Sequence, residues 1–364
     1  MATHDLFGHA GARSDLSRAL TSGRLPQVLL VTGEEGVGKQ RFALWLAELA
    51  LCKASAGQPC GSCLGCRRVR ELAHPDLHWF IPVARPKSSD PDKQIDEVRD
   101  ALGELYAARR EKSTYAPPDG MAMHGVASAR LILKTAGLTT VEGGRRVLII
   151  GHADRLVPQE ASQEAANALL KFLEEPPASA LIILTTTEPG RVLPTIRSRA
   201  IPVRLGRLSD VEVAQALQTL RPDLSADDRR RRAAAAEGSI GRALSASVTH
   251  DRLTEAEQLL ETVKQGGAGR FERILKQAAW QARGDFTDLL DALADSLGGA
   301  ARARTGGAAP ARRTASALDS VDDPRRLLDA MGHVDRARER AQGNLNPQLI
   351  LATLTAELGE TLWA

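Results

Sequence analysis

The chain has 364 residues, of which 26% are charged and 3% aromatic, and its formal net charge is +3. This length allows two or three domains with cores of their own, whereas the small net charge and the few aromatic residues argue against a general nucleic-acid-binding surface. No apolar stretch is long enough to cross a bilayer, and residues 1–5 lack the basic-then-apolar pattern of a secretion signal, so we expect a cytoplasmic protein.

The first predicted feature is a phosphate-binding loop. The apolar run 28–31 is followed by the glycine-rich segment 33–40, and apolar residues at helical spacing continue from there to Cys52. This order of strand, loop and helix is the context that a P-loop requires. The residues expected to surround phosphates are Gly33, Gly36, Gly38 and Lys39.

The residue after that lysine departs from the P-loop pattern. A Ser or Thr at this position normally holds Mg²⁺, but here Gln40 occupies it. Its amide oxygen stands on a longer stem, with poorer geometry for a small octahedral ion. The sequence therefore leaves open whether ATP or ADP binds at Lys39.

A cluster of cysteines follows the first predicted helix. The four cysteines of the chain all lie in one short window, at Cys52, Cys60, Cys63 and Cys66. In a reducing compartment such a cluster indicates a metal rather than disulfides or free buried thiols. Four thiolates fill all positions of a tetrahedral zinc, so we expect a structural Zn²⁺ site.

The chain up to about residue 205 is predicted to be one α/β domain. Apolar runs at 77–83, 147–150, 181–184 and 201–203 are typical of buried strands, and a helix is predicted over 162–174. Strands that alternate with helices indicate a parallel sheet covered on both faces. The segment 85–125 contains a charged helical stretch at 94–112, which we interpret as a solvent-facing insertion.

Residues 206–364 are predicted to be entirely helical. Ser209 and Glu212 form a capping box for the first of three short helices within 206–250. The arginine run 229–232 lies in the second of them and is interpreted as a solvated helix face. Amphipathic helices then fill 251–364, and we expect the Gly-, Ala- and Arg-rich stretch 302–317 to be a mobile loop.

Two segments carry a resemblance to a known family. Residues 164–177 read EAANALLKFLEEPP, and residues 193–199 read LPTIRSR. Together with the P-loop and the cysteine cluster, they closely resemble the clamp-loader ATPases of bacterial DNA polymerase III, a branch of the AAA+ family. The resemblance covers about residues 5–245. It implies an AAA+ domain with an inserted zinc module, a three-helix lid domain and an all-α collar domain for oligomerisation.

Motor subunits of that family carry catalytic groups that this chain lacks. An acidic pair should follow the strand 147–150 to hold magnesium and orient water, but Gly151 and His152 stand there, and Asp154 lies too far along to replace it simply. Thr186 and Thr187 match the sensor-one region. A sensor-two arginine is expected where Gly241 stands, and Arg242 is one position later, rotated by roughly 100° around the helix.

The Ser198-Arg199 pair matches the motif that supplies an arginine finger to a neighbouring subunit's ATP site, a task suited to the planar, permanently charged guanidinium. The resemblance thus implies a non-hydrolysing stator subunit without intrinsic ATPase activity. Its implied partners are the gamma/tau motor subunits and the delta subunit in a hetero-pentamer, and, through this assembly, the sliding clamp and primed DNA.

Two alternatives remain open from the sequence. The first is an active ATPase motor subunit of the same clamp loader, supported by the intact Lys39. The second is a zinc-bearing adaptor that binds nucleic acid, which the small net charge disfavours.

Overall fold

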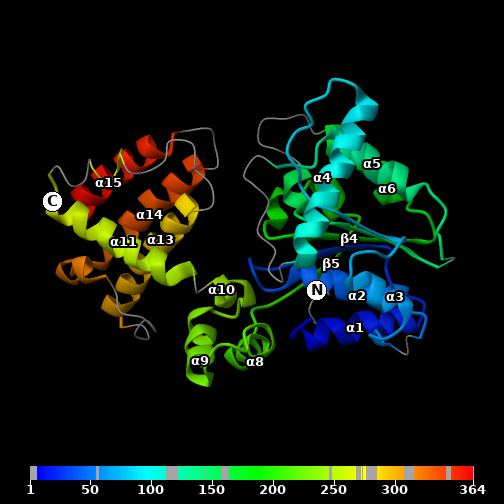
Figure 1. Ribbon diagram of the computed structural model, residues 1–364, viewed down its shortest axis with the longest axis horizontal. Helices are drawn as coiled ribbons and strands as arrows, with labels where there is room; N and C mark the ends of the chain where they lie inside the picture. The colour runs from blue at the N-terminus through cyan, green and yellow to red at the C-terminus, as the bar shows by residue number, and fades with distance from the viewer. Residues whose placement is uncertain are drawn as a thin grey trace. The chain divides into compact units, whose positions relative to one another are not determined.

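The computed structural model describes residues 6–54, 57–111, 122–142, 144–156, 164–245, 248–267, 272, 274–275, 285–306, 315–341 and 346–363. The chain forms two compact units, Met1–Leu244 and Ser245–Ala364, and each is described by itself (Figure 1). Within the described ranges, every helix is too short or too polar to cross a membrane.

The first unit is built on a five-stranded parallel sheet with the strand order β2-β3-β4-β1-β5. The strands are β1 (Val28–Thr32), β2 (Leu77–Phe80), β3 (Arg146–Ile150), β4 (Ala180–Thr186) and β5 (Ile201–Arg204). Every residue of β3 and β4 is buried, as expected for apolar strands covered on both faces. The predicted α/β fold with a parallel sheet is confirmed.

Helices surround this sheet. They are α1 (Ala10–Thr21), α2 (Lys39–Leu51), α3 (Leu64–Arg70), α5 (Val126–Ala136), α6 (Glu164–Glu174) and the short α7 (Pro194–Arg197). Helix α2 packs against β1, β3 and β4 and fully buries Phe42, Leu46 and Leu49. Because α2 follows β1 directly, the loop between them lies at the carboxyl end of the central strands, where α/β folds place their ligands. Of the predicted helix 162–174, residues 162 and 163 lie outside the described part of the chain.

The interpretation of 85–125 as a solvent-facing insertion is wrong for its helix. Helix α4 (Pro91–Glu111) buries Ile95, Val98 and Leu102 in the core of the first unit. Further along the same helix, the hydroxyl of Tyr106 accepts a hydrogen bond from the Trp79 backbone N–H at 2.7 Å and donates to the Trp79 carbonyl at 2.6 Å. The apolar residues recur at helical spacing among many charges, and α4 packs mainly on α5, while Tyr106 reaches the edge strand β2. Residues 112–121 lie outside the described residues.

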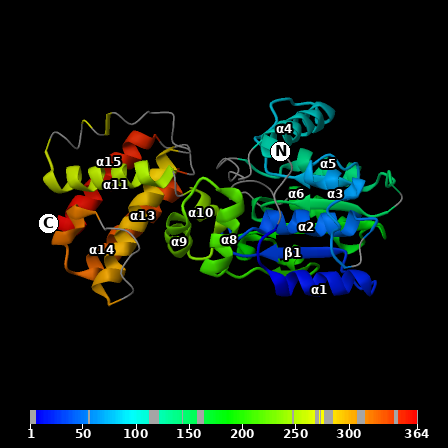
Figure 2. The same cartoon turned by 60° about the horizontal axis from the view of Figure 1, so that its bottom comes forward.

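Three short helices close the first unit and gather in one group (Figure 2). They are α8 (Asp210–Leu220), α9 (Ala226–Ala235) and α10 (Ile240–Ser245), around a small core that includes Val213, Leu217 and Ala243. The predicted capping box at the start of α8 is confirmed. Helix α9 ends before Gly238, whose φ of 78° is left-handed and where a Cβ would lie 2.5 Å from the Leu208 carbonyl oxygen.

The predicted solvated face of α9 is confirmed for Arg230 and Arg231, whereas Arg229 and Arg232 are half-buried. Arg230 pairs with Asp227 and Arg231 with Asp228, each across one helical turn, and all four side chains are well exposed. Exposed pairs of this kind hold the arginine run against its own helix.

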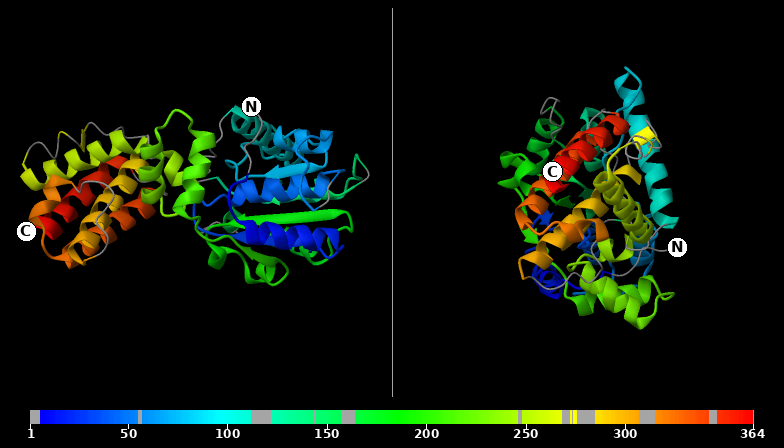
Figure 3. Two further views of the ribbon diagram at one scale, coloured as in Figure 1. Left: turned by 90° about the horizontal axis from the view of Figure 1, so that it is seen from below. Right: turned by 90° about the vertical axis from the view of Figure 1, so that its left-hand side faces the viewer.

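In its described residues, the second unit contains a bundle of four long helices, which lie side by side in the left panel of Figure 3. They are α11 (Val248–Gln265), α13 (Asp285–Arg304), α14 (Pro324–Ala341) and α15 (Pro347–Trp363), joined by the 3-10 helix η3 (Ser316–Ser320). Their shared core includes Leu260, Leu290, Leu327, Leu354 and Leu358.

The expected mobile loop 302–317 is wrong at both of its ends. Residues 302–304 are the last turn of α13, and Ala315 and Ala317 are buried at the start of η3. Arg304 donates hydrogen bonds to the carbonyls of Leu318 and Val321, at 2.7 and 2.5 Å, so an arginine that reads as a loop residue anchors η3. Residues 307–314 are not among the described residues.

Candidate functional site

The P-loop lies where the sequence predicts it, between β1 and α2, but its lysine is hydrogen-bonded to the loop itself. Gly38 adopts a φ of 102° immediately before α2, so that the loop turns into the helix. The Lys39 ammonium donates to the carbonyls of Gly33 at 3.0 Å and Glu34 at 2.6 Å, both on its own loop. Burial lowers the pKa of Lys39 to about 8, an effect that Glu35 and Asp154 partly offset. The cation expected to reach phosphates is therefore already hydrogen-bonded within the loop.

Gln40 connects two strands of the sheet. Its amide nitrogen donates to Thr185 Oγ1 on β4 at 2.9 Å, and its amide oxygen accepts from the indole Nε1 of Trp79 on β2 at 3.2 Å. Trp79 and Thr185 are buried, so these hydrogen bonds satisfy polar groups that water does not reach. The position that holds magnesium in a working P-loop is filled here by a hydrogen-bonded amide.

Gly151 makes room for this amide. A Cβ at Gly151 would lie 3.0 Å from Gln40 Nε2, 3.2 Å from Gln40 Oε1 and 3.4 Å from Trp79 Nε1. Any larger side chain there, including the acidic one expected after β3, would compete with Gln40 for the same space. The missing hydroxyl and the missing carboxylate are thus parts of one packing arrangement.

The last short helix lies directly on the P-loop. Ser239 Oγ donates to the Glu35 carbonyl at 3.0 Å, and the N–H of Gly241 donates to the Gly36 carbonyl at 3.0 Å. A Cβ on Gly241 would lie 2.8 Å from Gly36 Cα, so the approach requires glycine. The residue that stands in place of the sensor-two arginine therefore serves backbone packing.

Arg242, the arginine next to that position, pairs with an exposed carboxylate. Its guanidinium contacts the carboxylate of Glu237 at 3.2 Å, and both side chains are exposed. A second exposed pair lies nearby, because Arg207 contacts Glu34 of the P-loop at 2.8 Å. Arg207 also lies 3.5 Å from Glu237, so these four charged side chains form one connected, exposed network beside the P-loop.

Sequence reasoning missed the place of Asp154. His152 has a left-handed φ of 55°, and the 3-10 helix η1 (Ala153–Leu156) follows it. This turn buries Asp154, whose carboxylate accepts a hydrogen bond from Thr186 Oγ1 at 2.5 Å and attracts the Lys39 ammonium. The sequence does not indicate that the chain turns back at this point, because a positive φ such as that of His152 is unusual for a residue other than glycine. Thr186 is buried in this contact, whereas Thr187 lies one residue beyond β4 and is partly exposed.

Arg199 lies just after α7 and is not one of the hydrogen-bond partners of Lys39. Its guanidinium donates to the Thr195 carbonyl at 2.7 Å and forms an ion pair with Glu174 at the end of α6. The side chain is 31% exposed and that of Glu174 is 45% exposed. A neighbouring molecule can therefore reach this arginine from solvent.

The four predicted cysteines come together. Their sulfur atoms all lie within 4.8 Å of one another. Cys60 Sγ and Cys66 Sγ are 3.8 Å apart, and Cys52 Sγ and Cys63 Sγ are 3.9 Å apart. Four thiolates around one zinc at ~2.3 Å would be separated by ~3.8 Å, so the spacing fits a tetrahedral metal site. These four residues could hold a metal ion.

Backbone N–H groups in the cysteine cluster point at sulfur, as they do around metal-bound thiolates. Cys63 N lies 3.3 Å from Cys60 Sγ, and Cys66 N lies 3.4 Å from Cys63 Sγ. The hydrogen bond from Cys63 lowers the pKa of Cys60 to about 6, whereas burial raises the pKa of Cys66. A bound cation would be needed to keep the buried Cys66 as a thiolate.

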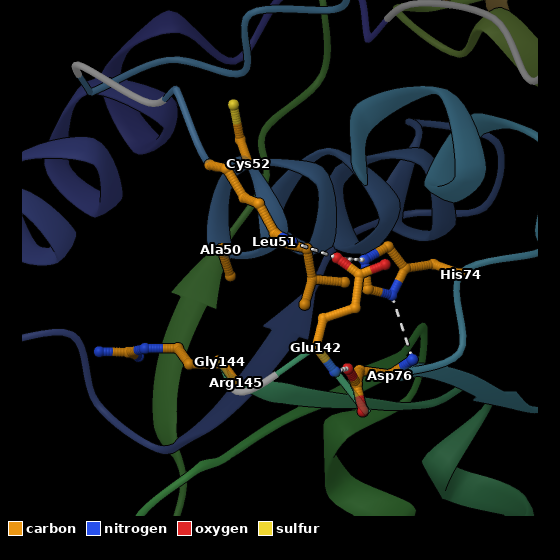
Figure 4. Close-up of a pocket in the computed structure, with 9 residues that line it drawn as sticks. Ala50, Leu51, Cys52, His74, Asp76, Glu142, Gly144 and Arg145 are labelled. Carbon is orange, nitrogen blue, oxygen red and sulfur yellow. Dashed lines mark hydrogen bonds and ion pairs between the residues drawn. The ribbon is translucent and has the colours of Figure 1, made fainter. Parts of the chain in front are cut away.

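A cavity of about 200 Å³, lined by both apolar and charged side chains, lies beside Cys52 (Figure 4). Glu142 projects into it and pairs with Lys53 and with Arg68 of α3, each at 2.8 Å. The carboxylate of Asp76 accepts the backbone N–H groups of Val141 and Glu142 at 2.8 and 3.0 Å, which lowers its pKa although burial opposes this. These contacts fasten the cysteine module to the loop that precedes β3.

Comparison with known proteins agrees with this architecture. A family model described as "DNA polymerase III, delta subunit" matches residues 8–209. The DNA polymerase III subunit delta' of Bacillus subtilis is 30% identical over 184 residues, which cover 50% of this chain and 43% of that protein. The corresponding protein of Pseudomonas aeruginosa is 31% identical over 173 residues, covering 47% of this chain and 40% of its own length. The matched segments thus span less than half of these relatives.

Other relatives have different names. The DNA polymerase III subunit tau of Salmonella typhimurium is 29% identical over 209 residues, covering 57% of this chain and 26% of that protein. Among solved structures, a DNA polymerase III gamma subunit-related protein from Thermotoga maritima covers 96% of this chain and 99% of its own, with a TM-score of 0.40 and 16% identity. Because the family match spans more than half of the chain, including the P-loop, the cysteine cluster and Arg199, this chain belongs to the DNA polymerase III delta-subunit family of clamp-loader proteins.

Proposed function

We propose that the chain is a non-hydrolysing stator subunit of the bacterial DNA polymerase III clamp loader, of the delta-prime kind. In this role it helps to load the sliding clamp on primed DNA and donates Arg199 to the ATP site of a neighbouring subunit. The observation that carries the proposal is the amide of Gln40, which occupies the magnesium position of the P-loop and is held there by Trp79 and Thr185.

Hydrolysis at this P-loop would require several rearrangements at once. Lys39 would leave two carbonyls of its own loop, and Gln40 would leave its two hydrogen-bond partners. No carboxylate follows β3 directly to hold magnesium or orient water. These features support a site kept for its packing rather than for phosphoryl transfer.

Arg199 has the properties that a finger in trans needs. It is permanently charged, it is accessible, and it follows a short helix that holds its backbone. Inserted beside a neighbour's nucleotide, a guanidinium stabilises the charge that develops on the transferred phosphoryl group. The proposed neighbours are gamma/tau motor subunits, with the delta subunit completing a hetero-pentamer.

The helical parts have proposed roles in the assembly. Residues 206–250 would serve as the lid, whose contact with the P-loop stiffens the subunit, and residues 251–364 would serve as the oligomerisation collar. This division into three domains remains a prediction, as does the assembly with the clamp and DNA.

For the cysteine cluster we propose zinc. Four sulfur ligands at tetrahedral spacing favour Zn²⁺ over hard cations. Cys52, Cys60, Cys63 and Cys66 would fill every coordination position, so the ion would supply folding stability to the segment 52–66 and no catalysis.

Two observations favour a second candidate, an active motor subunit. The P-loop glycines and Lys39 are intact, and the relatives include tau subunits. This candidate predicts hydrolysis of ATP by the purified chain, whereas the stator role predicts none above a Lys39→Ala control.

The experiment that tests the stator role compares two variants in the clamp loader reconstituted with its motor and delta subunits. Arg199→Ala should lower the ATPase activity stimulated by clamp and primed DNA by roughly 10³-fold at the adjacent site, while Lys39→Ala should leave it nearly unchanged. Circular dichroism would confirm that both variants fold. The reverse ranking would overturn the proposal.

A further inference from the structure

We infer that Glu174 is a counter-ion that holds Arg199 in the free chain and is displaced when a phosphate of the neighbouring subunit competes for the guanidinium. The inference rests on the proposed role of Arg199 as a finger in trans. It adds a positioning residue, Glu174, that the sequence does not identify.

The position of Glu174 is informative in itself. It is the last residue of α6 (Glu164–Glu174), where the helix dipole disfavours a carboxylate. Its charge is compensated by Arg199, which lies 25 positions along the chain and is brought next to it because α7 packs on α6. An acidic residue at an unfavourable helix end is therefore stabilised by the arginine that the function uses.

The hold on Arg199 is incomplete. One terminal nitrogen, Nη2, meets the Glu174 carboxylate, and the other, Nη1, donates to the Thr195 carbonyl at 2.7 Å and to Ser198 Oγ at 3.4 Å. The Nε atom of Arg199 is buried and has no hydrogen-bond partner among the described residues. A guanidinium prefers to engage an anion with two parallel N–H groups. The Glu174 contact uses only one of its nitrogens.

Exposure makes this pair replaceable. Both side chains are partly open to solvent, at 31% and 45%, so water screens their attraction. Phosphate oxygens of a bound nucleotide carry more charge and can accept the two-pronged contact that Glu174 does not make. Glu174 therefore holds the arginine in place before assembly and yields it on engagement. Breaking the pair adds to the cost of nucleotide binding at the neighbour's site.

The first test uses the isolated full chain. Phenylglyoxal modifies accessible arginines, and peptide mass spectrometry reports the rate at Arg199 alone. Glu174→Gln keeps the shape and removes the charge, so we expect Arg199 to react about two- to fivefold faster, the range that corresponds to an exposed ion pair. Glu175→Gln is the matched control, because Glu175 is the next residue and is equally classed as exposed. Equal rates in the two variants would overturn the inference.

The second test uses the reconstituted clamp loader and ATP. Glu174→Gln should lower the half-saturating ATP concentration about two- to fivefold, because less of the binding energy is spent on opening the pair, and should leave the rate at saturating ATP unchanged. A merely structural role of Glu174 would not lower the half-saturating ATP concentration while leaving the rate at saturating ATP unchanged. A lower rate at saturating ATP, or no shift relative to Glu175→Gln, would refute the displacement of Glu174. If Arg199→Ala has no effect in this assembly, the finger role fails, while the modification rates still report on the pair.

Discussion

Replacing Gln40 by alanine tests whether its amide is a structural part of the first unit. The change removes the acceptor of the Trp79 indole N–H, which is buried, and one of the two donors to Thr185 Oγ1. Thr185 keeps the backbone N–H of His152 at 3.3 Å, so its loss is partial. An orphaned buried donor costs about 1–3 kcal/mol. We therefore expect the free energy of unfolding of the first unit to fall by that amount.

Hydrogen exchange followed by mass spectrometry measures this loss where it occurs. Peptides from α2 and β2 should show an opening free energy lower by about 1–3 kcal/mol, while peptides from α14 and α15, in the other unit, serve as the internal reference. Gln215→Ala on α8 removes the same amide from an exposed helical position and should be close to neutral. Equal exchange in the two variants would refute a structural role for the Gln40 amide.

A double-mutant cycle then tests the packing between Gln40 and Gly151. Gly151 is not among the described glycines with positive φ, so alanine fits its backbone. The new Cβ would lie 3.0 Å from Gln40 Nε2 and push the amide from its partners. Gly151→Ala should destabilise the unit with Gln40 present and have little effect with Gln40→Ala, an interaction of about 0.5–3 kcal/mol. Strict additivity would show that the two sites are independent.

Three further predictions concern other parts of the first unit. Cys60→Ser should reduce bound zinc, measured by plasma mass spectrometry of the purified chain, from one ion per chain to a small fraction of that. Tyr106→Phe should destabilise the contact between α4 and β2 by about 1–2 kcal/mol, because both Trp79 backbone partners lose a hydrogen bond; faster exchange confined to α4 and β2 peptides would be the signature. The pKa of the fully buried His124 is lowered to about 4 by burial. Since the unfolded chain takes up that proton near pH 6.5, stability should fall by about 1.4 kcal/mol per pH unit from pH 6.5 towards pH 4. His124→Asn should reduce the slope in thermal unfolding by about 1.4 kcal/mol per pH unit. The remaining slope comes from His78 and His152, because burial lowers the pKa of each of them to about 4 as well. A slope equal to that of the unchanged chain would contradict the assignment.

The sheet was predictable because strands β1 to β4 are largely apolar and almost entirely buried. The prediction that 201–203 is a buried strand is wrong in part, because β5 lies at the edge of the sheet and is mostly exposed. Buried parallel strands appear in a sequence as short continuous runs, and each predicted run contains a strand. The boundaries differ where polar chemistry intervenes. β2 stops at Phe80, before Pro82, which has no N–H for the ladder. β4 extends to Thr186, because Thr185 and Thr186 are buried and hydrogen-bonded to Gln40 and Asp154.

The long charged helix α4 was not recognisable in the same way. Its few apolar residues recur at positions 95, 98 and 102 among many charges, a pattern typical of both a core-facing helix and a solvated one. What decides between them is the packing partner, mainly helix α5, and such a partner is not visible in local periodicity. The anchoring role of Arg304 was not predictable either, because the carbonyls that accept its hydrogen bonds lie 14 and 17 positions along the chain.

In the candidate site too, features set by neighbouring residues were predictable, and contacts between distant segments were not. The cysteine spacing predicted four neighbouring sulfurs because short turns alone bring them together. The identity of Gln40 predicted a weakened magnesium site, since the family pattern needs only one residue for that inference. The partners of Gln40 on β2 and β4 and the partner of Arg199 on α6 were beyond reach, because each pair is formed by tertiary packing between segments far apart in the sequence.

The departures from a working ATPase site are linked by packing and do not behave as independent losses. Gln40 fills the space that a side chain at position 151 would need, and Gly241 can lie on Gly36 only because neither carries a Cβ. Restoring a serine at 40 alone would remove the amide that accepts the buried Trp79 indole N–H, and restoring an acidic residue at 151 alone would crowd the Gln40 amide. Each single reversal is therefore destabilising before any catalytic benefit appears. On the proposed stator role, single substitutions at these positions are therefore expected to leave the site without activity. Arg199 takes no part in this packing, because its contacts are with Thr195, Ser198 and Glu174.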